Sequence, residues 1–199
     1  MSRRSAADTR RRLLLKAGLA LPAAWYLPRG WAAPAAKPTP ACGDDGPTPS
    51  QIAGPFYTPD SPVKMNFRVD DPSGTPVNLR AIVLDTRCRP VAGAVVDLWH
   101  ADSKGRYDND GFRLRGHQLA DAQGTVHFQT VMPGNYGFRT RHFHVQIFRN
   151  GGGRLLTTQL YFPDEPGNAD DGLFERELLL DAARAGTILE ARFTFVVGA

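Results

Sequence analysis

The pair His142 and His144 carries the most evident chemistry in this sequence. Side chains two residues apart on a β-strand project from one face, so a strand here would present both imidazoles together and point Phe143 the other way. Residues 145–148 are β-branched and aromatic in an alternating pattern, which favours a strand. Two imidazoles on one rigid strand make half of a metal site, and the rest of the chain must supply the other ligands.

Two tyrosines are the candidates for those ligands. Tyr107 lies in a polar, glycine-containing loop after a strand-like run, and Tyr136 follows a turn at 133–135. Loops on a rigid scaffold commonly present functional groups, although either tyrosine alone would more often be a packing residue. Two phenolates are hard anionic donors that suit a ferric ion, whose charge can drive loss of the phenol protons. The remaining histidines fit no such pattern and are interpreted as structural or surface residues: His100, His117 and His127.

Many short strands must position these side chains. Six strand-like runs are separated by turn signals such as Pro90, Gly93 and residues 151–153. The runs cover residues 79–85, 94–100, 125–131, 143–148, 155–162 and 188–197. The sequence therefore predicts an all-β fold, a single β-sandwich domain over residues 51–199. The only helix candidate is the acid-rich stretch 170–183, and no repeat or second domain is evident.

The first 36 residues have the pattern of an export signal. A basic region containing Arg11 and Arg12 precedes an apolar run at 17–27 and a series of small residues, as in twin-arginine signal peptides. The apolar run is short for a membrane span, and an uncleaved N-terminal anchor is the alternative. We expect a Pro-rich linker at 37–50 and an exported protein, periplasmic or extracellular, carried by the twin-arginine export machinery.

The formal charge of +4 belongs to this leader. Residues 1–36 hold seven of the 24 basic residues and one of the 20 acidic residues, which leaves 17 and 19 in the remainder and a net charge of −2. That balance gives no reason to expect a nucleic-acid partner.

Cys42 and Cys88 are the only cysteines. In an exported chain they predict one disulfide that ties the linker to the domain, and two free thiols are the alternative.

Several separated motifs resemble those of the intradiol ring-cleavage dioxygenases, the family of catechol and protocatechuate dioxygenases. The resemblance covers about residues 48–198. In chain order, the matching stretches are 48–57, 97–107 with the first tyrosine ligand, 133–136 with the second, 139–144 with an arginine and the histidine pair, and 158–162 with a glutamine.

The resemblance implies a β-sandwich of the intradiol dioxygenase core type with a non-haem Fe(III), held by Tyr107, Tyr136, His142 and His144. A small aromatic diol would chelate the metal while Tyr136 departs, and O₂ would open the ring between the hydroxylated carbons to give a cis,cis-muconate-type diacid. The resemblance also implies roles for four other residues. The charge of Arg139 would stabilise negative charge that develops on the substrate, and Gln159 would form a hydrogen bond near the same place. Tyr57 and Trp99, together with Arg139, would contact the substrate. For Arg139 and Gln159 the alternatives are a solvated charge and an ordinary strand residue.

The chain departs from the family pattern between the second tyrosine and the histidines. Only five residues separate Tyr136 from His142, fewer than in the well-known cytoplasmic members. This loop helps shape the substrate pocket in the family, so the ring substituents of the substrate stay open, as does assembly into a homo-oligomer. Export points to aromatic compounds met outside the cell, such as plant- or lignin-derived ones.

Two other classes of protein remain as alternatives. A transthyretin-like β-sandwich binding module would fit the turn and strand pattern, since sandwiches host both binding and catalysis. An exported copper protein using His142 and His144 would need a further His, Cys or Met donor at a sensible position, and none is evident. Tyr107 together with the two histidines favours the enzyme.

Overall fold

The computed structural model describes residues 42–43 and 46–198. The chain divides into two compact units, residues 1–35 and 36–199, and all described residues belong to the second. The expected signal segment at 1–36 and much of the linker at 37–50 lie outside the described residues. Among the residues described, no helix is long and apolar enough to cross a membrane.

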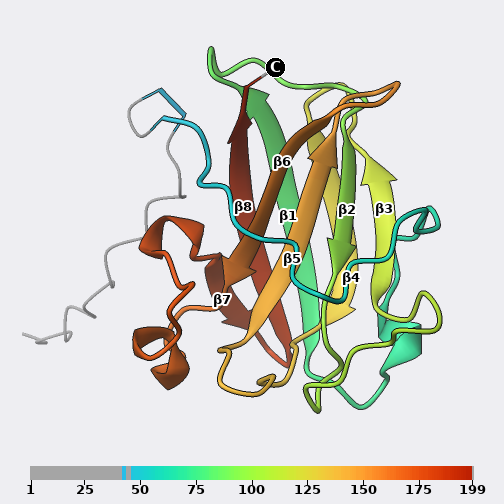
Figure 1. The fold of residues 1–199 in the computed structure, drawn as a ribbon, viewed down its shortest axis with the longest axis vertical. Coiled ribbons are helices and arrows are strands. Elements are labelled where there is room, and N and C mark those ends of the chain that lie inside the picture. Colours follow the sequence, from blue (N-terminus) through green and yellow to red (C-terminus); the bar gives the residue numbers. More distant parts are fainter. Residues whose placement is uncertain (1–41, 44–45, 199) are drawn as a thin grey trace, which may run out of the picture. The chain divides into compact units, whose positions relative to one another are not determined.

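Eight strands form two four-stranded sheets (Figure 1), which confirms the predicted all-β sandwich. One sheet has the order β4-β1-β8-β7, with bounds Thr125–Val131, Pro76–Asp85, Ile188–Val197 and Asp181–Ala185. The other has the order β3-β2-β5-β6, with bounds Arg115–Leu119, Val95–Trp99, His142–Phe148 and Arg154–Tyr161. All neighbours pair antiparallel except β1 and β8.

The hydrophobic core lies between the sheets. On β1 every second residue is buried, including Val77, Leu79 and Ala81, as alternating side chains on a half-buried strand require. On β5 the core-facing residues are Phe143 and Val145, with Ile147 beyond them. The histidines of β5 therefore point to the outer face of their sheet.

The N-terminal segment 48–62 crosses this outer face and buries it (Figure 1). Backbone N–H groups of Thr48 and Gln51 donate to Val196 and Thr157 at 2.9 and 2.8 Å, and the His117 N–H donates to Pro62. As a result the outward residues of β5 are as inaccessible as the inward ones: six of its seven residues are buried. A polar site on an outer sheet face is thereby shielded from water.

The prediction of a helix at 170–183 is wrong. The region contains short 3₁₀ turns, η2 (Pro166–Ala169) and η3 (Arg176–Leu178), followed by the edge strand β7. β7 pairs with β8 at the edge of its sheet, and its sequence, Asp-Ala-Ala-Arg-Ala, shows no alternation of large apolar and polar side chains. The other missed strand, β3, is also an edge strand with a polar sequence. A third 3₁₀ turn, η1 (Arg68–Asp70), precedes β1.

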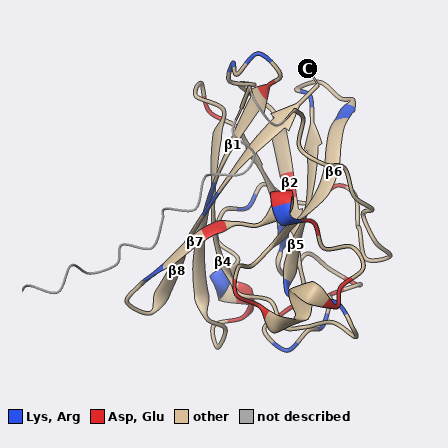
Figure 2. Cartoon of the chain, turned by 90° about the vertical axis from the view of Figure 1, so that its left-hand side faces the viewer, with Lys and Arg blue, Asp and Glu red and all other residues tan. Residues whose placement is uncertain are grey.

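Cys42 and Cys88 form a disulfide with their Cα atoms 5.6 Å apart. It joins the first described residues of the second unit to the turn that follows β1. On the side seen in Figure 2, basic and acidic residues are interspersed, in agreement with the near-balanced charge of residues 37–199.

Candidate metal centre

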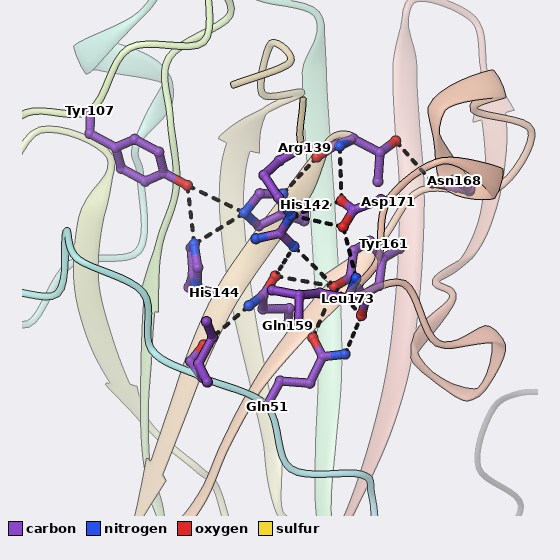
Figure 3. Close-up of polar contacts among 12 residues, drawn as sticks. Gln51, Tyr107, Arg139, His142, His144, Gln159, Tyr161, Asn168, Asp171 and Leu173 are labelled. Atoms are coloured by element: carbon purple, nitrogen blue, oxygen red, sulfur yellow. Dashed lines mark hydrogen bonds and ion pairs between the residues drawn. The ribbon is translucent and has the colours of Figure 1, made fainter. Parts of the chain in front are cut away.

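Three side-chain donor atoms converge on the outer face of β5 (Figure 3). The Tyr107 hydroxyl lies 3.1 Å from His144 Nε2 and 3.5 Å from His142 Nε2, and the two Nε2 atoms are 3.1 Å apart. All three atoms can offer a lone pair to a metal ion once the phenol has lost its proton. Separations of about 3 Å are those of neighbouring ligands around one metal ion with bonds of about 2 Å. The arrangement fits a cation.

Burial keeps both imidazoles neutral, and a hydrogen bond fixes the orientation and tautomer of His142, whereas His144 Nδ1 has no hydrogen-bond partner among the described residues. His142 Nδ1 lies 2.6 Å from the Thr140 carbonyl oxygen and donates to it, which leaves the Nε2 lone pair for a metal. The His144 ring stacks on Trp99, with centroids 5.0 Å apart and planes 7° apart. Burial lowers the pKa of His142 to about 4 and that of His144 well below its ordinary value. At neutral pH each imidazole is therefore neutral, with a proton on only one of its two ring nitrogens.

Tyr107 reaches the histidines from the loop after β2. Its ring stacks on Phe56 at 4.4 Å and meets Tyr136 edge-on at 5.5 Å. Burial raises the pKa of the Tyr107 phenol, so without a cation the phenol stays protonated at neutral pH. A metal ion at the donors would supply the charge that removes this proton.

The loops that carry the two tyrosines cross at a pair of glycines. The Gly134 N–H donates to the Asp102 carbonyl oxygen at 2.8 Å. A Cβ on Gly105 would lie 2.0 Å from the Asn135 carbonyl oxygen, and Gly105 also has a φ of +79°. Only glycine allows this approach, which fixes the loops relative to each other.

Tyr136 is adjacent to the donors through its ring and not through its hydroxyl. It is 39% exposed, and its ring contacts Phe56 at 5.1 Å besides Tyr107. A tight hairpin pairs its backbone with Arg139, whose N–H donates to the Tyr136 carbonyl oxygen at 2.8 Å. In the described part of the chain, no hydrogen bond joins its hydroxyl to the other three donors. Its role as a fourth ligand stays a prediction.

Arg139 and Gln159 are in direct contact. Arg139 Nη2 donates to Gln159 Oε1 at 2.6 Å and to the Tyr161 hydroxyl at 3.2 Å, while Nε donates to both carboxylate oxygens of Asp171 at 2.8–2.9 Å (Figure 3). Arg139 is thus no solvated surface charge: its side chain is only 11% exposed.

Asp171 is a site residue that the sequence reasoning missed. Its side chain is fully enclosed, and besides Arg139 it accepts hydrogen bonds from the backbone N–H groups of Thr140 and Leu173, both at 3.0 Å. The misread helix at 170–183 concealed it. No short sequence motif links Asp171 to Arg139, which are 32 residues apart. The two side chains meet only because the turn at η2 folds back beside β5.

Tyr57 and Trp99 lie behind His144. The Tyr57 ring packs on Trp99 at 4.8 Å, and its hydroxyl donates to Asp97 at 3.4 Å. The structure therefore brings neither polar group to the three donors, and a substrate contact for either residue stays a prediction.

The other histidines lie away from the converging donors. His100 is buried and hydrogen-bonded to Thr130 and Ala101, His117 contacts Ser61, and His127 is exposed on β4.

A β-sandwich in which two imidazoles and a phenol converge beneath a covering segment presents a donor set that suits a metal ion. The family model described as Dioxygenase matches residues 52–195. The chain belongs to the intradiol ring-cleavage dioxygenase family.

Relatives and solved structures agree with this assignment. The chain is 42% identical to the dioxygenase domain of a dioxygenase carbohydrate-binding protein fusion from the cellulolytic bacterium Streptomyces sp. SirexAA-E, with a TM-score of 0.74 over 77% of this chain and 99% of that one. The catechol 1,2-dioxygenase structure from Pseudomonas arvilla C-1 has 26% identity and a TM-score of 0.68, over 78% of this chain and 63% of that one. Catechol 1,2-dioxygenase 2 of Acinetobacter lwoffii is 31% identical over 76% of this chain and 65% of its own length. The chain spans between half and two thirds of the curated relatives it matches first.

Proposed function

We propose that the protein is a non-haem Fe(III) dioxygenase that cleaves catechol-type rings between the two hydroxylated carbons. The observation that carries the proposal is the convergence of the Tyr107 hydroxyl with the Nε2 atoms of His142 and His144, within 3.1–3.5 Å of one another. The relatives named as catechol 1,2-dioxygenases support the choice of reaction and substrate class. A passive sandwich module has no need of such a buried donor set.

The donor set fits iron in its ferric state. Imidazole suits several first-row metals, whereas a phenolate is a hard anionic oxygen donor that favours Fe(III) over softer ions. Tyr107, His142 and His144 would hold the metal, and Tyr136 would join them or leave as substrate binds. When bound, a ferric ion would supply the electron-withdrawing charge that makes the ring of a catecholate reactive towards O₂, and the expected product would be a cis,cis-muconate-type diacid.

Arg139 is the residue best placed to act on the substrate. Its Nε and Nη2 are committed to Asp171, Gln159 and Tyr161, whereas its Nη1 has no hydrogen-bond partner within residues 42–43 and 46–198. A fixed cation with one unused donor would stabilise negative charge that develops on the ring oxygens and the adjacent carbon. Because the fixing contacts already exist, little reorganisation is needed during turnover.

Gln159 completes the polar wall of the site. Its Nε2 donates to the Ile52 carbonyl oxygen at 3.1 Å, which ties the covering segment to β6, and its Oε1 accepts from Arg139. Both polar ends of the amide are therefore engaged by protein. We assign Gln159 the role of orienting Arg139 and holding the cover that excludes water.

The proposal extends to location. The twin-arginine-like pattern at 1–36 suggests export, and the twin-arginine route carries folded proteins, so iron could be loaded first. The substrates would then be aromatic diols outside the cytoplasm, such as those released from plant material.

Metal analysis of the purified mature protein tests the proposal. We expect about one iron per chain and a visible colour from phenolate-to-iron charge transfer. Tyr107→Phe should change or bleach the colour, and His142→Ala or His144→Ala should remove most of the iron. His127→Ala, on the exposed outer face of β4, is the matched control and should keep both. A colourless, iron-free wild type that binds aromatics without turnover would favour a binding module, and stoichiometric copper would also contradict the proposal.

A further inference from the structure

Arg115, the first residue of β3, carries a guanidinium buried in the outer layer of the domain. The residue is 1% exposed, among the largest fully buried side chains described. Its Nε and Nη2 donate to the Asp108 carbonyl oxygen at 3.0 and 2.5 Å, and its Nη1 donates to the Phe56 carbonyl oxygen. All three groups of donors thus end on backbone oxygens.

No carboxylate forms a direct ion pair with this cation, although Asp108 and Asp97 stabilise its charge from a distance. Of the five ion pairs in the described part of the chain, none includes Arg115. Taking a guanidinium out of water is costly even with acidic side chains nearby, and here all of its hydrogen bonds go to two backbone carbonyl groups. The preceding residue, Leu114, adopts a φ of +53° although it is not a glycine, and non-glycine residues in this region cluster at functional sites.

The two carbonyl groups flank the aromatic pair of the metal centre. Asp108 follows Tyr107 directly in the chain, and Phe56 provides the ring that stacks on Tyr107 at 4.4 Å and 17°. One planar guanidinium therefore fixes both the loop that carries the Tyr107 phenol and the ring against which that phenol lies. Lysine could not do both, since a single ammonium lacks the rigid fork of donors.

Arg115 also shares a row with the metal centre. Across the sheet, Arg115 pairs with Trp99, Trp99 with His144, and His144 with Gln159. Residues directly opposite on antiparallel strands project from the same face, so these four side chains line one level of the outer sheet face. The sheet thus sets the distance between the Arg115 guanidinium and His144, the histidine that the Tyr107 hydroxyl contacts.

We propose that Arg115 is a positioning residue for Tyr107, acting through the carbonyl groups of Asp108 and Phe56. It touches neither substrate nor metal. The inference rests on the proposed function, in which Tyr107 is a ligand. The role of the buried cation of β3 is then to hold the Tyr107 ligand in place, and no motif in the sequence indicates that role.

The test compares Arg115→Met and Arg115→Lys with Arg106→Met as the matched control. Arg106 precedes Tyr107 in the same loop, but its guanidinium pairs with Asp102 and its side chain is 70% exposed. We expect the affinity for iron to fall 10- to 100-fold in Arg115→Met, the usual effect of losing an outer-shell support. The charge-transfer band should move to longer wavelength, because a positive charge near the phenolate is lost, whereas Arg115→Lys should shift it less. Arg106→Met should match wild type in both measurements.

A crystal structure of metal-free Arg115→Lys gives a readout that does not depend on iron. We expect the Tyr107 hydroxyl to move away from the 3.1 Å contact with His144. If that contact and the iron affinity of wild type are both retained, the inference is overturned while the proposed function stands. If Arg115→Met fails to fold, Phe56→Leu, which removes only the stacked ring, should still shift the band, and an unchanged band would likewise overturn the inference. An iron-free wild type with a displaced Tyr107 in the variant would instead overturn the function and keep the positioning role of Arg115.

Discussion

At the scale of single residues, the guanidinium beside the three converging donors is fixed by its own hydrogen bonds. Arg139 is held by a carboxylate, an amide oxygen and a phenol, all within 3.2 Å. A cation held in this way in a water-poor site stabilises developing negative charge far better than one in solvent. Two residue-scale predictions separate this electrostatic role from metal binding and from stability.

Arg139→Leu should leave iron content and colour largely intact while it lowers turnover by about 10²–10³-fold, equivalent to about 3–4 kcal/mol of barrier. Guanidinium offers donors but no lone pair to a metal, so the ligands remain. Steady-state rates with catechol, measured below the melting temperature of the variant, check this. Arg141→Leu is the control, because that guanidinium pairs with Glu165 at 3.0 Å. Turnover of Arg139→Leu at the wild-type rate would remove the assigned role.

Asp171→Asn should lower the free energy of unfolding by about 3 kcal/mol, because it leaves Arg139 buried without its anion. In the Arg139→Leu background the same change should cost less than half as much, since the cation it served is already absent. A double-mutant cycle by denaturant unfolding measures this difference. Additive effects would show that the two side chains are not energetically coupled.

At the scale of elements, the segment 48–62 acts as the outer cover of the sheet β3-β2-β5-β6. Backbone contacts hold both of its ends, and two side-chain hydrogen bonds add to them: Ser61 donates to Asp97 at 2.7 Å and Gln159 donates to the Ile52 carbonyl oxygen. Without this cover the histidines would face water. We therefore expect the stability of the cover and that of the metal centre to rise and fall together.

Asp97 makes this cover sensitive to pH. Burial raises the pKa of Asp97 from 3.8 to about 6, although the Ser61 hydrogen bond partly opposes the shift. Folding thus favours the protonated form, so the contribution is fully present below pH 4 and is lost as the pH rises through 6, by about 2–3 kcal/mol in total. Unfolding free energies measured from pH 4 to 8 should show this fall in wild type and lack it in Asp97→Asn. Ser61→Ala should extend the fall to higher pH, and identical profiles for all three proteins would contradict the account.

The sequence predicted those elements whose pattern is local. The alternation at 143–148 and the spacing of His142 and His144 located β5 and two converging donors, and the six predicted strands all exist. The edge strands β3 and β7 were missed, because β3 is mostly polar and β7 is mostly alanine, so neither shows an apolar alternation. Asp171 and Arg115 were missed for another reason. Each acts through partners more than 30 residues away in the chain or through backbone oxygens, which leave no residue pattern.

At the scale of the whole molecule, the proposed export signal at residues 1–36 precedes the dioxygenase domain, and its use can be tested. Replacing both arginines, Arg11→Lys and Arg12→Lys, should leave precursor in the cytoplasm if the twin-arginine route is used, because that route reads the guanidinium pair. Cell fractionation with immunodetection measures this. The matched control is Arg3→Lys with Arg4→Lys, an arginine pair that no apolar run follows closely. Normal export of the Arg11/Arg12 double variant would contradict the prediction.

The position of ring cleavage distinguishes the proposed reaction from its alternatives. Purified, iron-loaded protein should convert catechol and ¹⁸O₂ into an open cis,cis-muconate-type diacid that carries two labelled oxygen atoms, one in each carboxyl group, as seen by mass spectrometry. This outcome follows if Tyr107, His142 and His144 hold a ferric ion that a catecholate chelates beside Arg139. A semialdehyde product would mean cleavage beside the diol, and a diacid with a single labelled atom would mean that water supplied the other oxygen. Either result would contradict the account.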